Sequence, residues 1–324
     1  LNRGGSFSNA SGQAFGALDR HGCAAGDLDA DGHKDILCSL GAARGKIVKR
    51  HELSLKPHRS GGSLDRSVAG ASDPFGRGRH VGIFKLDKDK YPEVFIANAP
   101  DRNDGFPGLN RFYRNVKGKL VPAAEVGLDT AHGAECVVTG DVDQDGDQDL
   151  VYCTQYGFSG RVAGIRFMRN ENGVLRDRTA TRDMRPMGDI DVEFADVTGD
   201  GRKDLIQLAP KRLRVSKWTR NGYRRIWEAS LTDAWAIAAG DASGDGKADI
   251  YVVRGSDKSN KPDRLFVSKN KGTKFVSVKI PTTSKGVADD VIALDYDKNG
   301  HMDFVVLNGR TQQGPVQLLA SFPR

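Results

Sequence analysis

DVDQDGDQD, residues 141–149, places five aspartates among nine positions. So many like charges in one turn repel one another unless a cation lies among them. The stretch is therefore a cation-binding loop, an acidic turn facing solvent, or part of an EF-hand. An EF-hand has a glutamate at its twelfth position and a helix on each side. Here the twelfth residue is Tyr152, and the flanking runs CVVTG and LVYC are typical of β-strands, so the EF-hand is excluded.

The nine-residue pattern recurs along the chain. Successive copies begin 45 to 58 residues apart, and the interval from the last copy, past the C-terminus, to the first is 56 residues. Every interval is thus one repeat long, which is typical of a repeat protein. The copies lie at residues 27–35, 85–93 (degenerate), 141–149, 196–204, 241–249 and 295–303.

Each repeat is expected to form four antiparallel strands. Short apolar runs on both sides of each loop predict the first two strands. A second hairpin follows, with turn dipeptides such as Asn-Gly in residues 166–177 and Lys-Gly in residues 265–278. Repeated units of this kind predict an all-β fold, a β-propeller. Six loops predict six blades in one domain over residues 1–324, with the N-terminal segment as a strand that closes the last blade; seven blades is the alternative.

The loop pattern D-x-D-x-D-G-x-x-D predicts calcium sites. The first, third, fifth and ninth side chains offer oxygen, the seventh residue offers its backbone carbonyl, and the glycine permits a sharp turn. Oxygen ligands in a flexible cage suit Ca²⁺ better than zinc or copper. Acidic solvent turns are the alternative, and five copies in register disfavour it. The predicted ligands of about five Ca²⁺ sites are Asp27, Asp29, Asp31, His33, Asp35, Asp141, Asp143, Asp145, Asp147, Asp149, Asp196, Thr198, Asp200, Arg202, Asp204, Asp241, Ser243, Asp245, Lys247, Asp249, Asp295, Asp297, Asn299, His301 and Asp303.

The predicted sites differ in charge. The loops at 27–35 and 141–149 offer four carboxylates each, whereas the other three replace one carboxylate by a neutral Thr, Ser or Asn. Fewer carboxylates usually weaken calcium binding, so these three sites should empty first. In the degenerate copy Lys85 stands at the first position and Lys90 replaces the glycine. We expect a lysine ammonium to take the place of the ion there.

The repeats resemble the FG-GAP/VCBS-type calcium-binding β-propellers, a class of repeat also found in integrin α-subunit heads. The hairpin NRFYRN at residues 110–115 is similar to the propeller of the cartilage acidic protein family. The resemblance covers essentially the whole chain and implies the propeller fold and calcium. It does not imply one function, because the class includes adhesion proteins, lectins and modules attached to enzymes.

Four cysteines occur in two pairs around two of the loops. Cys23 and Cys38 lie four residues before and eleven after the first aspartate of their loop, and Cys136 and Cys153 lie five before and twelve after theirs. One hairpin register would therefore place both pairs directly across two strands. We predict disulfides Cys23–Cys38 and Cys136–Cys153, with buried free thiols as the alternative. Disulfides and calcium sites together favour a secreted, extracellular or periplasmic location.

The charge balance favours an acidic partner. The chain carries a formal charge of +7, although the predicted side-chain ligands, which leave out Asp147 with its carbonyl, take up 17 of its 42 acidic residues; five Ca²⁺ ions would raise the formal charge to +17. Such a surface suits an acidic glycan or an acidic protein partner. No recognised nucleic-acid motif is present, and no apolar run is long enough to span a membrane. The recognition residues predicted on the connectors opposite the loops are Arg44, Arg102, Phe106, Tyr156, Phe158, Arg161 and Arg310.

Basic residues also gather at 46–59, 76–80 and 211–225. In 211–225 the charges alternate as on a solvent face, and protection of a sheet edge is the simpler interpretation. Trp218, Tyr223 and Trp227 would either stack on a glycan or pack between blades.

Two functions remain open. The first is a non-catalytic binding or adhesion module. The second is an extracellular polysaccharide lyase or lactonase working at the propeller funnel, although a polar, water-filled lining also explains the residues there. The residues expected at the funnel are His21, His80 and His132, the catalytic candidates, on one half, and Asp189, Asp191, Asp233, Asp289 and Asp290 on the other.

Overall fold

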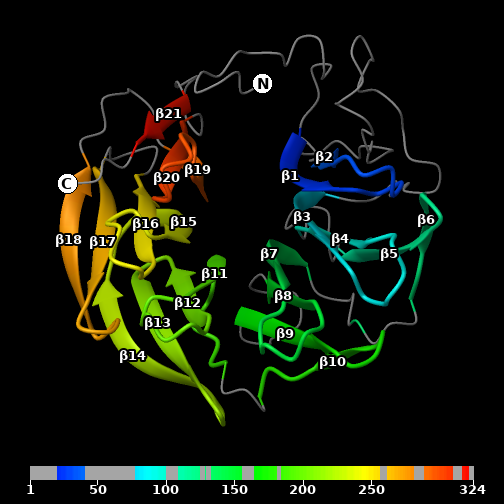
Figure 1. The fold of residues 1–324 in the computed structure, drawn as a ribbon, viewed down its shortest axis with the longest axis horizontal. Helices are drawn as coiled ribbons and strands as arrows, with labels where there is room; N and C mark the ends of the chain where they lie inside the picture. The colour runs from blue at the N-terminus through cyan, green and yellow to red at the C-terminus, as the bar shows by residue number, and fades with distance from the viewer. Residues whose placement is uncertain are drawn as a thin grey trace. The chain divides into compact units, whose positions relative to one another are not determined.

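In the described part of the chain, every element of regular secondary structure is a β-strand (Figure 1). The chain divides into two compact units, unit 1 (Leu1–Ala180) and unit 2 (Thr181–Arg324). The computed structural model describes residues 20–40, 77–99, 109–124, 128, 133–154, 164–180, 184–255, 261–280, 288–308 and 316–320.

Unit 1 contains three antiparallel sheets within these residues, and neighbouring strands in each sheet are also neighbours in the chain. The first is the hairpin β1–β2, the second has the order β3-β4-β5-β6, and the third has the order β7-β8-β9-β10. The strands are β1 Arg20–Gly26, β2 Asp35–Leu40, β3 Gly78–Phe84, β4 Glu93–Asn98, β5 Arg111–Val116, β6 Lys119–Pro122, β7 Ala134–Gly140, β8 Asp149–Thr154, β9 Gly164–Asn170 and β10 Leu175–Asp177.

Unit 2 repeats the same plan. Its sheets have the orders β11-β12-β13-β14, β15-β16-β17-β18 and β19-β20-β21, all antiparallel. The strands are β11 Asp191–Ala195, β12 Asp204–Ala209, β13 Arg212–Thr219, β14 Gly222–Ser230, β15 Ala234–Gly240, β16 Asp249–Arg254, β17 Asp263–Lys269, β18 Lys274–Ile280, β19 Ala288–Leu294, β20 Asp303–Asn308 and β21 Val316–Leu319.

The fold is an all-β propeller with four-stranded antiparallel blades, but the blade count is five, so both the predicted six and the alternative seven are wrong. Four sheets have four strands and the β19–β21 sheet has three. In the part of the chain that the structure describes, the repeat at 27–35 is present only as the hairpin β1–β2. The prediction counted loops, and a loop requires only two strands, whereas a blade also requires a second hairpin bonded to them. The predicted closing strand lies in residues 1–19, outside the described residues.

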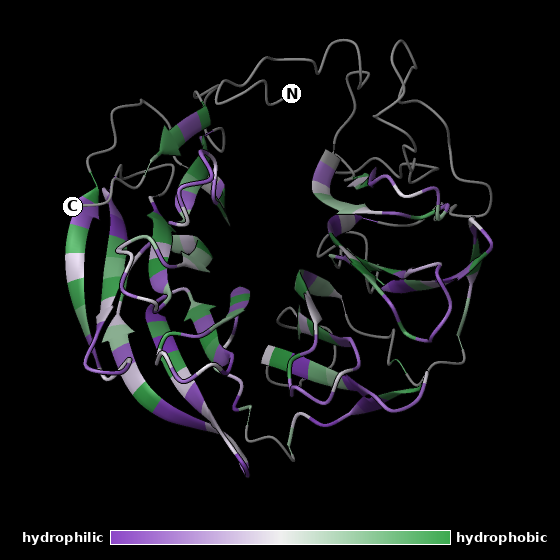
Figure 2. Ribbon diagram, viewed as in Figure 1, coloured by the Kyte–Doolittle hydropathy of each residue, from purple (hydrophilic) through white to green (hydrophobic). Residues whose placement is uncertain are grey.

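The second strand of each complete blade is buried along its whole length, as in β4, β8, β12 and β16. Such a strand has a bonded neighbour on each side and another sheet against its face, which explains its continuous apolar sequence. Within each unit the core is formed by buried residues of successive sheets. The ribbons of these strands carry hydrophobic segments (Figure 2). Aromatic pairs join them: Phe95 and Tyr152 have ring centroids 5.4 Å apart in unit 1, and Tyr251 and Phe304 are 5.0 Å apart in unit 2.

The cysteines have the register predicted from their spacing. Cys23 pairs directly with Cys38 across β1–β2, and Cys136 with Cys153 across β7–β8. Both pairs form disulfides, with Cα atoms 4.1 and 5.0 Å apart. Each disulfide brackets one of the two loops that offer four carboxylates. Among the described residues there is no helix long and apolar enough to cross a membrane.

Candidate metal centre

Each repeated loop joins the first two strands of a sheet, as the sequence predicts. The loop at 27–35 connects β1 to β2, and the loop at 141–149 connects β7 to β8. Unit 2 has three such loops, before β12, β16 and β20, and the degenerate copy lies between β3 and β4. The candidate sites therefore occupy equivalent positions in successive sheets.

The first aspartate of each loop organises the turn. In the first loop, Asp27 accepts hydrogen bonds from the backbone N–H groups of Asp31 and Gly32, both at 3.0 Å. The same two bonds, from positions five and six, occur in the other four intact loops, at Asp141, Asp196, Asp241 and Asp295. One carboxylate thus holds the turn closed while its charge remains inside the loop.

Two residues per loop have the left-handed backbone conformation. The glycine at position six has φ between 78° and 98°, which favours glycine because a Cβ is disfavoured there. Position four is also left-handed, with φ of 58° at Ala30, 59° at Gln144 and 62° at Lys298. The degenerate loop at 85–93, which is fully described, has no left-handed residue. The turn that bends the ligand positions together is therefore absent there.

The ninth position is a buried carboxylate that joins the loop to its sheet. Asp149 is fully buried; it accepts the N–H of Val142 in the loop at 3.0 Å and that of Asn170 on β9 at 2.9 Å. Burial raises the pKa of Asp149 to about 7, the two hydrogen bonds oppose this, and the charges of Asp143 and Asp145 add to it. A cation bound beside Asp149 would lower this pKa, because the cation favours the ionised carboxylate.

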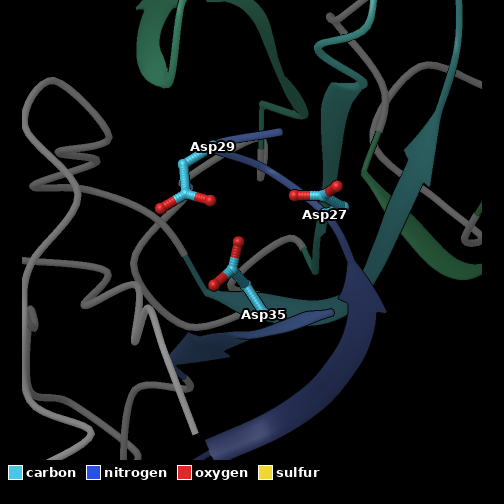
Figure 3. Close-up of side chains that lie close together, drawn as sticks. All are labelled: Asp27, Asp29 and Asp35. Carbon is cyan, nitrogen blue, oxygen red and sulfur yellow. The ribbon is translucent and has the colours of Figure 1, made fainter. Parts of the chain in front are cut away.

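Three loops bring carboxylates close enough to share one ion. Oxygens of Asp27, Asp29 and Asp35 lie within 4.8 Å of one another (Figure 3). The same positions converge in the loops at 141–149 and 295–303. Two oxygens bound to one Ca²⁺ at about 2.3–2.6 Å lie at most about 5 Å apart, so these separations fit a single ion. The donors are all oxygen, which matches Ca²⁺ rather than zinc or copper.

The loops at 196–204 and 241–249 are built differently. Position three is Thr198 or Ser243, and its backbone N–H, rather than that of position two, donates to the ninth carboxylate, at 3.0 Å from Asp204 and 2.8 Å from Asp249. Position four is a glycine in both, with φ of 72° and 71°. These two loops therefore offer a hydroxyl where the other three offer a carboxylate.

Positions five and seven interact with each other. The N–H of the seventh residue donates to the fifth side chain in every intact loop, for example from Asp147 to Asp145 at 3.0 Å and from His301 to Asn299 at 2.8 Å. The same bond joins His33 to Asp31, Arg202 to Asp200 and Lys247 to Asp245. The groups within 4.8 Å contain positions one, three and nine, all of which belong to the predicted ligand set. The ninth position is the buried anchor of each group.

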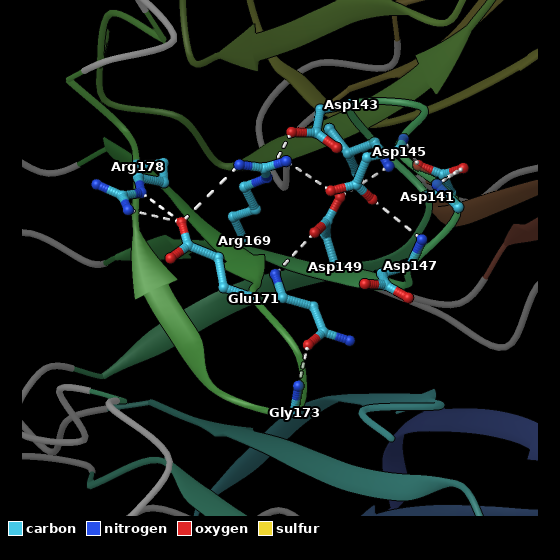
Figure 4. Close-up of polar contacts among 12 residues, drawn as sticks. Asp141, Asp143, Asp145, Asp147, Asp149, Arg169, Glu171, Gly173 and Arg178 are labelled. Carbon is cyan, nitrogen blue, oxygen red and sulfur yellow. Dashed lines mark hydrogen bonds and ion pairs between the residues drawn. The ribbon is translucent and has the colours of Figure 1, made fainter. Parts of the chain in front are cut away.

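The third strand of a blade supplies a cation to the loop, which sequence analysis missed. Arg169 on β9 contacts Asp143 at 2.9 Å and Asp145 at 2.7 Å (Figure 4). Lys217 on β13 contacts Asp200 at 2.7 Å, and Lys269 on β17 contacts Asp245 at 3.4 Å. The basic residue near the end of these three strands was a visible signal, but only the hairpin geometry shows that it reaches the loop.

The degenerate loop does not use its own lysines as expected. Asp87 is paired with Arg114 of β5 at 3.4 Å, and the ammonium of Lys90 lies 5.2 Å from the ring centre of Tyr91. The expectation of a lysine at the ion's place is therefore wrong. The cation comes from the third strand, as in the loops at 141–149, 196–204 and 241–249.

The first strands of the sheets carry the predicted polar residues in two separate groups. In unit 1, Arg79 contacts His21 at 3.1 Å, and burial together with Arg79 and His21 lowers the pKa of His80 to about 4. In unit 2, burial raises the pKa of Asp191 well above its usual value, and that of Glu193 to about 7, with Asp290 adding to both. Glu193 was missed, although it follows Asp191 by two residues and so faces the same side of β11.

Other predicted residues stay apart from these groups or cannot be placed. Asp189 is buried and accepts a hydrogen bond from Gln207 at 2.9 Å, and Asp233 pairs with Lys261 at 2.7 Å. His132 and the side chain of Asp289 are outside the described residues. So are the basic stretch at 46–59 and all the predicted recognition residues, Arg44, Arg102, Phe106, Tyr156, Phe158, Arg161 and Arg310.

Repeated blades whose first two strands enclose an aspartate loop define a β-propeller with candidate metal sites. The FG-GAP-like repeat family matches residues 85–152, 196–252 and 241–306, which together are more than half of the chain. The chain therefore belongs to the family of FG-GAP-like repeats. A search of the curated proteins gave no match.

Among solved structures, the chain is similar to an Agrocybe aegerita lectin described for its specific recognition of non-reducing terminal N-acetylglucosamine. The sequences are 16% identical, the match covers 94% of this chain and 81% of that chain, and the TM-score is 0.48. At this level the likeness carries no information about what this chain binds.

Proposed function

We propose that this protein is a secreted, calcium-stabilised propeller that acts as a non-catalytic binding module for an acidic glycan or protein partner. The observation that carries the proposal is the convergence of three aspartates at equivalent points of three loops, within 4.8 Å in each. Because the five intact loops hold 18 of the 42 acidic residues, the rest of the chain has a clear excess of basic residues. The two disulfides support a location outside the reducing cytosol.

The calcium part is tested by titrating chelator-treated protein with Ca²⁺ in a calorimeter while thermal unfolding is followed in parallel. We expect about five sites, with free energies of unfolding that rise by roughly 2.7 kcal/mol per site when free calcium is 100 times its Kd. Magnesium is the control ion, because its smaller octahedral shell fits these flexible loops less well. The proposal would be contradicted if the Ca²⁺ titration gave no heat of binding and if Ca²⁺ left the unfolding temperature unchanged.

The binding part is tested with a panel of acidic and neutral glycans in the presence of Ca²⁺. We expect binding to acidic members that weakens with salt, because exposed charges are screened. The same samples are analysed for released products. If a bound glycan were turned over, the protein would be a lyase or lactonase instead of a non-catalytic binding module.

The enzyme alternative has one supporting observation, the contact of His21 with Arg79 beside His80. A lyase needs a base and a cation that neutralises a uronate, and these residues provide that pair of groups. However, a histidine with a pKa of about 4 is a weak base near neutral pH. The binding module is therefore the favoured function.

A further inference from the structure

We propose that the end of the β15–β16 hairpin remote from its metal loop binds a pyranose unit of an acidic glycan. Trp235 stacks on the sugar ring, and Lys261 and Asp233 bind its polar groups. The inference rests on the proposed function and names the residues that hold the glycan. All three residues lie in the described part of unit 2, and both strands are labelled in Figure 1.

Trp235 lies in a β-bulge at the start of β15. Ala234 pairs with Arg254 and Ala236 pairs with Val253, so Trp235 is an extra residue between two successive pairs of the ladder. Ala234 and Ala236 are buried, whereas Trp235 is partly exposed. A bulge redirects a side chain, and bulges are frequent beside functional sites. Here the bulge leaves a large aromatic side chain partly open to solvent.

The same bulge occurs in other sheets, with charged residues in this position. The register shifts equivalently at Arg79 in β3, Glu135 in β7 and Asp289 in β19. Arg79 and Glu135 are also partly exposed. The fold therefore accepts a hydrated side chain at this point and does not require an aromatic ring to complete its core. Tryptophan combines a large apolar face with one N–H donor and is enriched at binding sites.

The other two tryptophans of the chain serve packing. Trp218 is buried against Tyr223, with ring centroids 5.1 Å apart. Trp227 contacts Phe275 of the next sheet, with ring centroids 4.4 Å apart. For these rings the structure favours packing over stacking on a glycan, and Trp235 is the remaining candidate.

Hydrogen bonds fix the orientation of Trp235. Its indole N–H donates to the carbonyl of Gly255, and the N–H of Gly255 donates to the carbonyl of Asp233 at 2.7 Å. Asp233 has φ of 55°, a left-handed conformation that is uncommon outside glycine. Such conformations occur often at functional sites. A ring that is already held in place loses little conformational entropy when a ligand binds.

Asp233 and Lys261 add polar groups to the same network. Their side chains are paired at 2.7 Å and are 34% and 37% exposed. The Lys261 ammonium also donates to the hydroxyl of Thr232 at 2.8 Å. These are its two partners within the described residues, so one of its three donors is left for a ligand. An apolar ring next to a few placed polar groups is the usual composition of a small-ligand site.

Arg254 holds the two polar residues in place. It is buried, and its guanidinium donates to the carbonyl of Thr232 at 3.2 Å and to that of Pro262 at 3.4 Å. Thr232 precedes Asp233 and Pro262 follows Lys261, so one side chain ties together the two segments that carry the pair. Arg254 is therefore a positioning residue, because its donors are bonded to the backbone.

The site is separate from the metal loop of its hairpin. β15 runs from Ala234 to Gly240, and the loop at 241–249 follows its far end. The strand between Trp235 and Gly240 spans roughly 17 Å. A glycan can therefore bind while the loop holds its ion. This is also the end of the hairpin at which the sequence predicts recognition, opposite the loops.

The charges favour an acidic sugar over a nucleic acid. Asp233 and Lys261 neutralise each other, so a uronate carboxylate can accept the remaining ammonium donor while ring hydroxyls donate to Asp233. A nucleic-acid base would also stack on a tryptophan, but binding of its strand depends on an excess of cations along the phosphates. The Asp233 carboxylate would repel those phosphates.

The test measures the binding of oligogalacturonate, heparin oligosaccharides, malto-oligosaccharides and poly(A) to Ca²⁺-loaded protein by calorimetry. W235L removes the ring and keeps an apolar side chain, W235F keeps an aromatic ring, and K261M removes the ammonium. K274M is the matched control, because Lys274 is exposed at the other end of the same sheet. Circular dichroism and thermal unfolding check the fold of each variant. If W235L does not fold, W235Q replaces it, since the equivalent bulges in β3 and β7 carry charged side chains.

We expect oligogalacturonate to bind W235L about tenfold more weakly than wild type, W235F within about threefold and K274M within about twofold. K261M should lose about fivefold, because a charge-assisted hydrogen bond is removed. A folded W235L that binds as tightly as wild type would overturn the site and leave the proposed function intact. A wild-type protein that binds neither acidic oligosaccharide would overturn the proposed function itself. Tighter binding of malto-oligosaccharides or poly(A) than of both acidic oligosaccharides would show that the ligand is not an acidic glycan.

Discussion

Arg169 is a single side chain that neutralises part of the negative charge of the loop at 141–149. Its guanidinium contacts Asp143 and Asp145, and those hydrogen bonds and charges raise its own pKa. Without a metal it neutralises part of the repulsion among the aspartates. With a metal bound, the same oxygens are needed as ligands, so the arginine competes with the ion. Lys217 and Lys269 stand in the same relation to their loops.

The substitution R169Q should therefore strengthen Ca²⁺ binding at 141–149 and destabilise the metal-free protein. Each effect should be on the order of 1 kcal/mol, because the arginine is partly exposed. R166Q is the control, because Arg166 lies on the same strand but pairs with Asp177. Calorimetry and unfolding in chelator measure the two effects. Weaker calcium binding in R169Q would show that the arginine supports the site instead of competing for it.

Glu193 makes stability depend on pH independently of the loops. Its pKa of about 7 in the folded protein lies above the 4.5 of the unfolded chain. Between these values the folded state retains a proton that the unfolded state has lost, so the free energy of unfolding falls as pH rises from 4.5 to 7. E193Q should be more stable than wild type at pH 8, on the order of 1 kcal/mol, and unchanged at pH 4. Chemical denaturation at both pH values checks this, and an equal gain at the two would refute it.

At the scale of elements, the loops of unit 2 are bonded to one another. The N–H of Ala248 in one loop donates to the carbonyl of Asp196 in the preceding loop at 2.8 Å, and that of Met302 donates to Asp241 at 2.9 Å. The hydroxyl of Ser268 at the end of β17 also donates to Val197 at 2.7 Å. A loop that is ordered by an ion therefore helps to order its neighbour, which is a coupling between sites.

D295A should consequently weaken more than its own site. We expect the Ca²⁺ affinity of the loop at 241–249 to fall about fivefold or more, a common size for coupling between sites. D27A is the control, because its following loop at 85–93 is degenerate. Calorimetry would show the loss of one strong site in D27A, with a second site weakened only in D295A. Identical titrations, each lacking one site, would mean that the loops bind independently.

At the scale of the whole molecule, the two units are reinforced differently. Unit 1 has both disulfides, and each encloses a loop with four aspartates at ligand positions. Unit 2 has three loops, each with one neutral ligand position, and the described part of it has no disulfide. Fewer carboxylates weaken calcium binding, and a disulfide holds its loop in place without an ion.

Stepwise removal of calcium should therefore open unit 2 before unit 1. Hydrogen exchange followed by mass spectrometry, in buffers of decreasing free Ca²⁺, resolves the loops along the chain. Protection should disappear first at 196–204 and 241–249 and last at 27–35 and 141–149. Reduced protein is the control, in which the difference should shrink. Simultaneous loss of protection in both units would contradict this order.

The sequence by itself determined the loops, the hairpins and the cysteine pairs. All three depend on residues close together in the chain: glycine and aspartate set the turn, alternating apolar runs set the strands, and one register aligns both disulfides. Asp141 and Gly146, for example, form the hydrogen bond that the loop pattern requires. The assignment to the family followed from the same local pattern, because it is repeated.

Only the tertiary structure decided which sheets are completed as blades, which ligand positions converge, and which cations reach them. The blade count was wrong because a loop does not guarantee a second hairpin. Arg169 lies 20 residues beyond its loop, and Asp191 and Asp290 influence each other across 99 residues. Such pairs are brought together by strand pairing and the packing of sheets, which a local pattern does not specify.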